Sequence, residues 1–419
     1  MHQQLGEKAG PLVASAALFL LPSVGMGVVS PFAVRLATHA VTSVGQTAGT
    51  LYALSTFGSI AGTMLTTFVL IPALGAGAIL KGLAIALLAT AVATYPFASR
   101  RAAGVAPALA ALLAGGGAWA VDPPRIHLPP GSTLVVDRDT PYHHISVVDS
   151  ADGRRELRFD KYTESAISLR EPYESLSPYT DYFHLALLPR PQLRRALFIG
   201  AGGGIGPRTF HAHDPDMEID VVDIDAAVLE LARSHFYMDD VPQIRSMAAD
   251  GRQFVRHAAD GVYDAIVLDA FSIGGRIPFH LVTREFIELC RRKLTDGGVF
   301  LMNINSAATG EKGRIFRSMY RTIDAAFDGN VHAFLMYRRA APRDESRNIL
   351  LVGLNAAERP DRAQWARWAE AYQQRPGAAL DMTAARMTAM VEDLLSDLPD
   401  LSADPLFTDD YAPIETMPF

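Results

Sequence analysis

Residues 196–206, ALFIGAGGGIG, join a strand-like apolar run to a cluster of glycines, and this stretch decides the fold. A strand that runs through a glycine-rich turn into a helix lets the backbone approach a nucleotide-like ligand closely. The dinucleotide fingerprint G-x-G-x-x-G would need a glycine at position 205, where Ile205 stands. Residues 200–204 read G-x-G-x-G instead, so the loop predicts a nucleotide-like ligand other than a dinucleotide.

Strand-like and helix-like stretches alternate along the chain from about residue 194 onward. Helical stretches such as Ala226–Phe236 and Thr283–Leu294 separate most of the predicted strands. This alternation predicts a doubly wound, Rossmann-like α/β domain whose ligand binds at the carboxyl ends of the strands. The predicted strands lie near 196–199, 218–222, 244–248, 263–268, 299–304, 331–336 and 349–354.

Acidic residues end three successive predicted strands. Asp223 ends the second strand, 23 residues past Gly200, at the spacing where a carboxylate reaches a ribose diol. Asp250 ends the third strand, where it could accept an adenine amino group, and Asp269 ends the fourth. Asp225 and Asp250 also fit helix N-caps, which is the structural alternative. Because no basic residue in the loop is placed to neutralise phosphate, a nucleoside fits better than a nucleotide.

The first 121 residues contain four long runs without Asp, Glu, Lys or Arg. Apolar runs of this length predict transmembrane helices, near 11–34, 49–73, 78–97 and 102–121. Pro72, Gly75 and Gly77 are expected to mark the turn between the second and third helices. Three spans, with 102–121 against the protein or the interface, remain an alternative, as does a buried helical domain. A signal peptide would have one apolar region rather than several.

Charge divides the chain in the same way. Residues 1–121 carry a net +4, which leaves −11 for the remainder of a chain whose total is −7. An acidic soluble part argues against nucleic acid as a partner and is compatible with a cationic substrate. The single cysteine, Cys290, can form no intramolecular disulfide. His143-His144 and His211-x-His213 lack a third nearby ligand, so no metal site is predicted.

Two smaller regions flank the predicted α/β domain. After the proline-rich stretch Asp122–Gly131, alternating patterns near 133–137, 144–148 and 156–159 predict a small antiparallel β unit. Residues 357–398 fit two amphipathic helices. These patterns give four expected regions: transmembrane helices over 1–124, the β unit over 125–190, the Rossmann-like domain over 191–356, and C-terminal helices with an acidic closing loop over 357–419.

The combination of motifs resembles the spermidine synthase (polyamine aminopropyltransferase) family. The resemblance covers about residues 133–354 and rests on four stretches: RALFIGAGGGIGPRTF, VVDIDAAVLELARSHF, DGRQFVRHAADGVYDAIVLDAF and PFHLVTREFIELCRRKLTDGGVFLMNI. GMGVVSPFAVRL and TDDYAPIE are similar to bacterial forms that are fused to a membrane region. The resemblance implies a multi-pass inner-membrane protein with a cytoplasmic catalytic domain. It is also compatible with a homo-oligomer. It implies decarboxylated S-adenosylmethionine as co-substrate, with neither cofactor nor metal.

The resemblance also implies residue roles in donor binding. Asp223 would hold the ribose hydroxyls and Asp250, followed by Gly251, the adenine amino group. Gly200 and Gly202 would let the backbone approach the nucleoside.

The residues that the resemblance implies for binding the acceptor amine lie in stretches that are farther apart in the sequence. Asp269 would accept a proton from the attacking amine and orient it. Tyr179 and Asp181 fall where the family has a Tyr-x-Glu-like pair that contacts the polyamine and the aminopropyl group. His143 falls near a family glutamine that helps position the substrate.

Two departures from the family pattern bear on the substrate. Gly203 replaces the loop acid that pairs with the aminopropyl ammonium, and Ser272 replaces a second acid that would help bind a diamine. These losses weaken the case for putrescine and remove a carboxylate that would repel intact S-adenosylmethionine. Methyl transfer and a non-catalytic, membrane-tethered binding module therefore stay open beside aminopropyl transfer.

The C-terminal stretch DLSADPLFTDDYAPIETMPF allows two interpretations. It could be a solvated acidic tail. Alternatively, Asp409 and Asp410 could fold back over the strand ends and replace the acids missing at Gly203 and Ser272, with Phe407, Tyr411 and Ile414 docking the loop.

Overall fold

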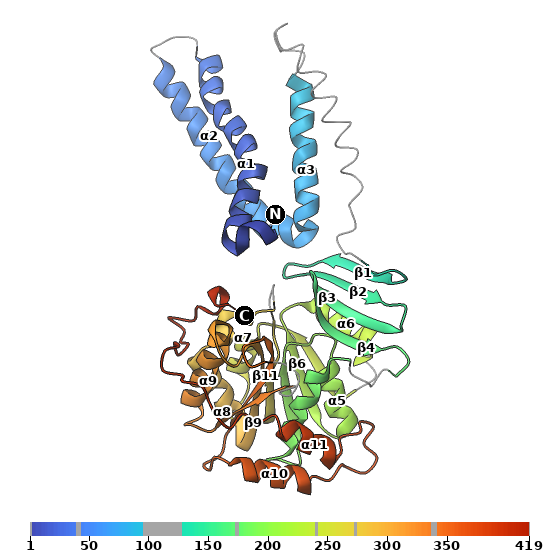
Figure 1. Ribbon diagram of the computed structural model, residues 1–419. Helices are drawn as coiled ribbons and strands as arrows, with labels where there is room; N and C mark the ends of the chain where they lie inside the picture. The colour runs from blue at the N-terminus through green and yellow to red at the C-terminus, as the bar shows by residue number, and fades with distance from the viewer. Residues whose placement is uncertain are drawn as a thin grey trace. The chain divides into compact units, whose positions relative to one another are not determined.

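We describe a computed structural model over residues 2–38, 43–94, 128–171, 176–238, 242–271, 275–336 and 342–418 (Figure 1). The chain divides into two compact units, Met1–Pro107 and Ala108–Phe419. The β unit, the Rossmann-like domain and the C-terminal helices predicted from the sequence all fall in the second unit. The fourth predicted apolar span, 102–121, lies outside the described residues.

The first unit is helical: α1 (His2–Ala37), α2 (Val44–Leu65), the π-helical turn η2 (Thr66–Leu70) and α3 (Ile71–Thr94). Helical structure continues from α2 through η2 into α3, so the turn expected at residues 72–77 is a helical bend rather than a loop. Figure 1 shows α2 and α3 diverging from this bend. Within the described residues, Val44–Leu70 is the one helix whose length and composition would suffice to cross a membrane. Most of its large apolar side chains are exposed, for example Phe57 at 72 %.

The second unit begins with a four-stranded antiparallel sheet in the order β1-β2-β3-β4. The strands are β1 (Thr133–Asp139), β2 (His144–Asp149), β3 (Arg154–Phe159) and β4 (Tyr162–Ser168). Sequence patterns predicted the first three and missed β4. Leu157 pairs with Ser165 and Arg158 with Thr163, so Glu164 has no partner across the sheet. This β-bulge interrupts the period-2 pattern by which a strand is recognised.

The main sheet has seven strands in the order β10-β11-β9-β8-β5-β6-β7. β5 to β9 run parallel, while β10 and β11 are antiparallel additions at one edge. All seven predicted strands are confirmed, and the doubly wound, largely parallel sheet with them. The strands are β5 (Arg195–Ile199), β6 (Glu218–Asp223), β7 (Ile244–Ala248), β8 (Tyr263–Leu268), β9 (Leu294–Ser306), β10 (Val331–Leu335) and β11 (Arg347–Leu354).

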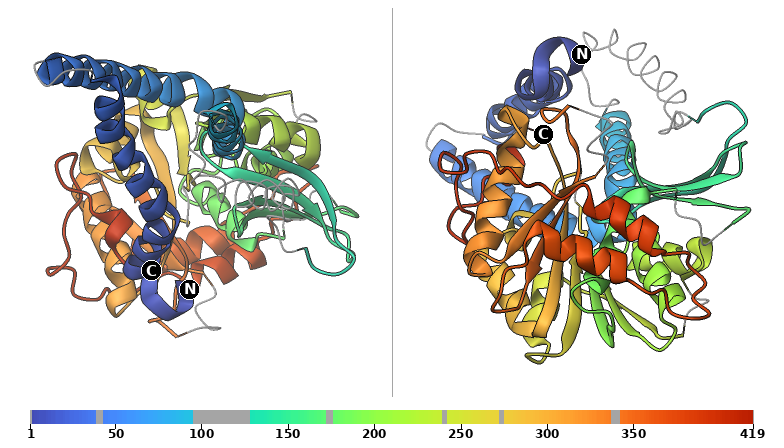
Figure 2. Two further views of the ribbon diagram at one scale, coloured as in Figure 1. Left: turned by 90° about the horizontal axis from the view of Figure 1, so that it is seen from above. Right: turned by 60° about the horizontal axis from the view of Figure 1, so that its bottom comes forward.

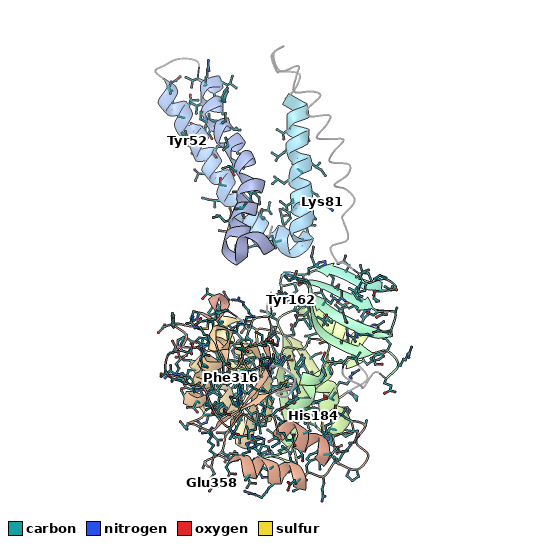
Figure 3. The ribbon with its side chains drawn as sticks, viewed as in Figure 1. Tyr52, Lys81, Tyr162, His184, Phe316 and Glu358 are labelled. Carbon is teal, nitrogen blue, oxygen red and sulfur yellow. The ribbon has the colours of Figure 1, made fainter. Side chains whose placement is uncertain are left out.

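Alternate residues of the central strands bury into two hydrophobic cores, one on each face of the sheet. Phe198 belongs to the first core, which includes side chains of η5, α5, α6, α10 and α11. Its neighbours Leu197 and Ile199 belong to the second, beside α7, α8 and α9, where Figure 3 labels Phe316. The helices are η5 (Pro178–Leu187), α5 (Ile205–His213), α6 (Ala226–Phe236), α7 (Gly251–His257), α8 (Arg284–Lys293), α9 (Arg314–Ala326), α10 (Arg362–Ala371) and α11 (Ala384–Val391).

The C-terminal region packs on the α/β fold. The two predicted amphipathic helices appear as α10 and α11, which lie side by side and bury Trp365 and Met387 (Figure 2). The segment after them is not a solvated tail, because Phe407 and Ile414 are fully buried in the second core. Asp404 is also buried, between the guanidinium groups of α9.

Candidate functional site

One cavity lies at the carboxyl ends of β5, β6 and β8. The strand order reverses at β5, which has β6 on one side and β8 on the other. Ligands of doubly wound sheets bind at this position. The cavity is lined by the glycine loop, by the three strand-end aspartates and by residues of the β unit. Distant segments therefore meet where the sequence predicted a nucleoside site.

The glycine loop is shaped by close backbone contacts. Gly200 has φ +96°, and a Cβ there would lie 2.3 Å from the carbonyl oxygen of Asp269. Gly202 has φ +48°, and its Cβ would lie 2.9 Å from the Ser165 hydroxyl. Side chains are excluded at both positions, so the loop leaves bare backbone facing the cavity.

Asp223 fixes the loop to the end of β6. Its Oδ2 accepts a hydrogen bond from the Ala201 amide at 2.9 Å, and its Oδ1 accepts one from the Asp225 amide at 2.9 Å. Burial raises the pKa of Asp223 to about 6, while these amides favour the ionised form. The side chain is therefore mainly ionised at neutral pH and keeps further lone pairs for a ligand hydroxyl.

Asp250 has both a structural role and a place in the cavity. Its Oδ1 accepts a hydrogen bond from the Gln253 amide at 2.8 Å and caps α7, as the N-cap alternative predicted. Its Oδ2 lies 3.0 Å from Nε2 of His280, another lining residue. The following Gly251 leaves no space for a side chain, since a Cβ would lie 2.5 Å from Cγ2 of Ile199.

The Asp269 carboxylate is held by two donors at the end of β8. Asn303 donates its Nδ2 hydrogen to Oδ1 at 2.9 Å, and the Tyr179 hydroxyl donates to Oδ2 at 3.1 Å. Asn303 is itself buried and accepts a hydrogen bond from Asn348 at 3.1 Å. Burial raises the pKa of Asp269 to about 6, and the two hydrogen bonds oppose that rise. The result is a fixed carboxylate that can exchange a proton near neutral pH.

The β unit supplies the remaining wall. His143 stacks on Phe159, with ring centroids 4.2 Å apart, and burial lowers its pKa. The His143 Nδ1 is buried and has no hydrogen-bond partner among the described residues. Glu164, at the bulge of β4, also lines the cavity. Burial and the charge of Asp269 raise the pKa of Glu164 to about 7.

Residues 179–344 match the family model of the spermine/spermidine synthase domain. This segment, which is less than half of the chain, is therefore similar to the spermine/spermidine synthase family.

Curated proteins are similar to part of the chain. The polyamine aminopropyltransferase of Vibrio vulnificus is 31% identical over 183 residues, which cover 42% of this chain and 61% of the relative. That of Prochlorococcus marinus is 31% identical over 195 residues, which cover 45% and 63%. The chain thus spans about three fifths of the length of these relatives.

Some solved structures are similar to part of the chain. A spermidine synthase in complex with the transition state analogue AdoDATO has a TM-score of 0.47 at 19% identity and covers 62% of this chain and 84% of its own. The human methyltransferase-like protein 13 in complex with SAH has a TM-score of 0.38 at 21% identity and covers 53% and 93%.

The doubly wound fold brings most of the predicted site residues to this cavity. His143, Tyr179, Gly200, Gly202, Asp223, Asp250, Gly251 and Asp269 all line it. Sequence reasoning missed Glu164, His280 and Asn303. The alternating pattern of β4 would have pointed to Glu164 only if the bulge had been recognised. Asn303 belongs to no motif that would have singled it out.

Three predicted substrate-binding residues lie elsewhere. Asp181 is buried in an ion pair with Arg386 of α11 and does not line the cavity. Asp409 accepts hydrogen bonds from Arg252 at 2.6 and 2.7 Å and from the Thr283 hydroxyl at 2.7 Å. Asp410 is exposed outside the cavity. Asp409 and Asp410 therefore do not reach the cavity in this structure. Phe407 and Ile414 dock the closing loop in the second core, as predicted, whereas Tyr411 is 59 % exposed and does not.

Of the two departures from the family pattern, one has a steric basis. A Cβ at Gly203 would lie 3.0 Å from both Cδ1 of Phe236 and Cβ of Ser165, so the loop has little space for an acidic side chain. Ser272 lies outside the described residues. Among the residues that are described, no group of three or more His, Cys, Asp or Glu side chains could hold a metal ion.

Proposed function

We propose that this chain is a polyamine aminopropyltransferase. It transfers the aminopropyl group of decarboxylated S-adenosylmethionine to an amine such as putrescine and releases methylthioadenosine. The observation that carries the proposal is the Asp269 carboxylate, which Tyr179 and Asn303 hold in the cavity of the glycine loop and Asp223. The spermine/spermidine synthase match over residues 179–344 supports it.

In the proposed reaction the amine nitrogen attacks the aminopropyl carbon bonded to sulfur. A carbon–nitrogen bond forms, the carbon–sulfur bond breaks, and its electron pair neutralises the sulfonium. The proton lost by the amine passes to Asp269. Alkylamines have a pKa near 10.4, so a positioned carboxylate must remove or share that proton before attack. A sulfonium is already an activated leaving group, so alignment is the main requirement and no resident cofactor is needed.

The donor-binding roles complete the proposal. Asp223 would accept hydrogen bonds from the ribose hydroxyls, while Gly200 and Gly202 keep the loop backbone close to the nucleoside. The Asp250 and Gly251 turn would face the adenine. Tyr179 would orient Asp269, and His143 would form part of the acceptor wall.

Methyl transfer from intact S-adenosylmethionine is the second candidate. One observation favours it: Gly203 leaves the loop without the acid that would repel the donor's carboxyl group. Product analysis separates the two reactions. The detergent-purified chain is incubated with each donor and a panel of amines. Methylthioadenosine indicates aminopropyl transfer, and adenosylhomocysteine indicates methyl transfer. Neither product would indicate a non-catalytic binding module.

We also propose that the first unit anchors the chain in the inner membrane by several helices, with the catalytic unit in the cytoplasm. The support is the composition of residues 1–121 and the helix Val44–Leu70, which is long and apolar enough to cross a bilayer. Recovery of the chain from carbonate-washed membranes is the expected result. Release into the soluble fraction would contradict the proposal. Light scattering of the detergent-purified chain would test for a homo-oligomer.

A further inference from the structure

Glu164 owes its position to the bulge of β4. The two flanking pairs, Leu157 with Ser165 and Arg158 with Thr163, leave Glu164 as the extra residue of its strand. A bulge redirects side chains near functional sites. Ser165 points into the glycine loop, where its hydroxyl accepts a hydrogen bond from the Gly203 amide at 2.8 Å. Glu164 lines the cavity beside that loop.

The cavity is strongly acidic. Its lining includes the carboxyl groups of Glu164, Asp223, Asp250 and Asp269, and neither lysine nor arginine is among the described residues that line it. Three of these acids have partners: amides for Asp223, an amide and His280 for Asp250, and Asn303 with Tyr179 for Asp269. An unbalanced group of half-buried carboxylates favours binding of a cation.

Glu164 is the acid of this group without a partner. No hydrogen bond or ion pair of its carboxylate occurs within the described part of the chain, and the charge of Asp269 acts on it. A second unpartnered polar group, the buried Nδ1 of His143, belongs to the same wall of the cavity. A half-buried carboxylate without a partner destabilises the fold when it is ionised, so its role is expected to appear when a ligand binds.

We propose that the Glu164 carboxylate binds an ammonium group of a substrate, and that it takes the cation-binding role for which the loop at Gly203 has little space. The inference rests on the proposed aminopropyl transfer, in which both donor and acceptor carry ammonium groups. The Phe159–His143 stack forms an aromatic wall of the cavity in which this ammonium group binds.

The test compares wild type with Glu164→Gln, which keeps the shape of the side chain and removes its charge. Glu171→Gln is the matched control, because Glu171 is an exposed carboxylate that follows β4. Calorimetry measures the Kd of decarboxylated S-adenosylmethionine, methylthioadenosine and 1,4-diaminobutane for each protein. Methylthioadenosine lacks the ammonium group and reports on the nucleoside contacts alone.

Glu164→Gln is expected to weaken binding of one cationic ligand by about ten- to a hundred-fold, as for loss of a hydrogen bond to a charged group. Weaker binding of the donor would place its aminopropyl ammonium at Glu164; weaker binding of the diamine would place the acceptor there. Methylthioadenosine should bind equally to all three proteins. The proposal is overturned if both cations bind Glu164→Gln as tightly as Glu171→Gln, or if wild type binds neither.

These binding measurements do not depend on turnover. A wild-type chain that binds the cations through Glu164 but releases no methylthioadenosine would refute aminopropyl transfer and leave the Glu164 assignment standing. Equal aminopropyl transfer by wild type and Glu164→Gln would refute the assignment alone.

Discussion

Asp269→Asn is the substitution that most directly perturbs the proposed chemistry. In the folded chain, Oδ1 accepts from Asn303 and Oδ2 accepts from the Tyr179 hydroxyl. An asparagine can keep both contacts, because its oxygen still accepts from Asn303 and its amide can donate to the tyrosine oxygen. The substitution therefore removes the charge and the proton acceptor while leaving the local packing in place.

The expected result is a fall in kcat of about 10²–10⁴, the range for loss of a general base. The donor Kd should change little, because Gly200 packs against the backbone of residue 269 rather than its side chain. Single-turnover release of methylthioadenosine measures the rate, and calorimetry measures donor affinity. Asp296→Asn, an exposed aspartate of β9 outside the cavity, is the matched control and should behave as wild type.

A pH profile adds a readout that a structural role would not affect. The pKa of Asp269 is raised to about 6, so wild-type kcat should fall as the pH drops below about 6 and the carboxylate becomes protonated. Tyr179→Phe removes a hydrogen bond that lowers this pKa and should move the fall to higher pH. If Asp269→Asn lost donor binding and turnover together, Asp269 would be a binding group and the assignment of the base would be wrong.

Three further predictions follow from the same cavity. Asp223→Ala should weaken donor binding by about 1.5–3 kcal/mol, as for loss of a charge-assisted hydrogen bond, and unchanged affinity by calorimetry would remove Asp223 from the site. Gly203→Asp should lower the melting temperature and the activity, because its Cβ would lie 3.0 Å from Phe236; a stable, more active variant would contradict the steric argument. The ligand-free chain should lose stability as the pH rises from about 4.5 to 7, because the folded state holds protons on Glu164 and Asp269 that the unfolded state has released. Thermal melts should show a smaller loss for Glu164→Gln, and an identical loss would contradict the raised pKa of Glu164.

The main sheet and the donor-binding residues could be predicted because the sequence patterns that mark them are local. Each strand of the main sheet is a short apolar run, and alternate residues such as Leu197 and Phe198 face opposite cores. A parallel sheet brings its strand ends to one edge, so Asp223, Asp250 and Asp269 had to lie close together.

The acceptor side could be predicted only in part, because it depends on irregular structure and on distant partners: Tyr179 and His143 line the cavity, but other expected residues do not. The bulge at Glu164 disrupts the alternation that marks a strand, so β4 and its acid were missed. Asp409 was expected at the cavity, but it pairs with Arg252, a residue 157 positions away. No sequence spacing reports such a pairing, and an acidic residue near the C-terminus fits a surface ion pair as well as a substrate contact.

The central claim is aminopropyl transfer, and the nucleoside product tests it most directly. The detergent-purified chain is mixed with decarboxylated S-adenosylmethionine and a diamine, and the products are separated by mass spectrometry. We expect one methylthioadenosine for each aminopropylated amine, with both products lost in Asp269→Asn and retained in Asp296→Asn. Release of adenosylhomocysteine from intact S-adenosylmethionine, with no methylthioadenosine from the decarboxylated donor, would contradict the account.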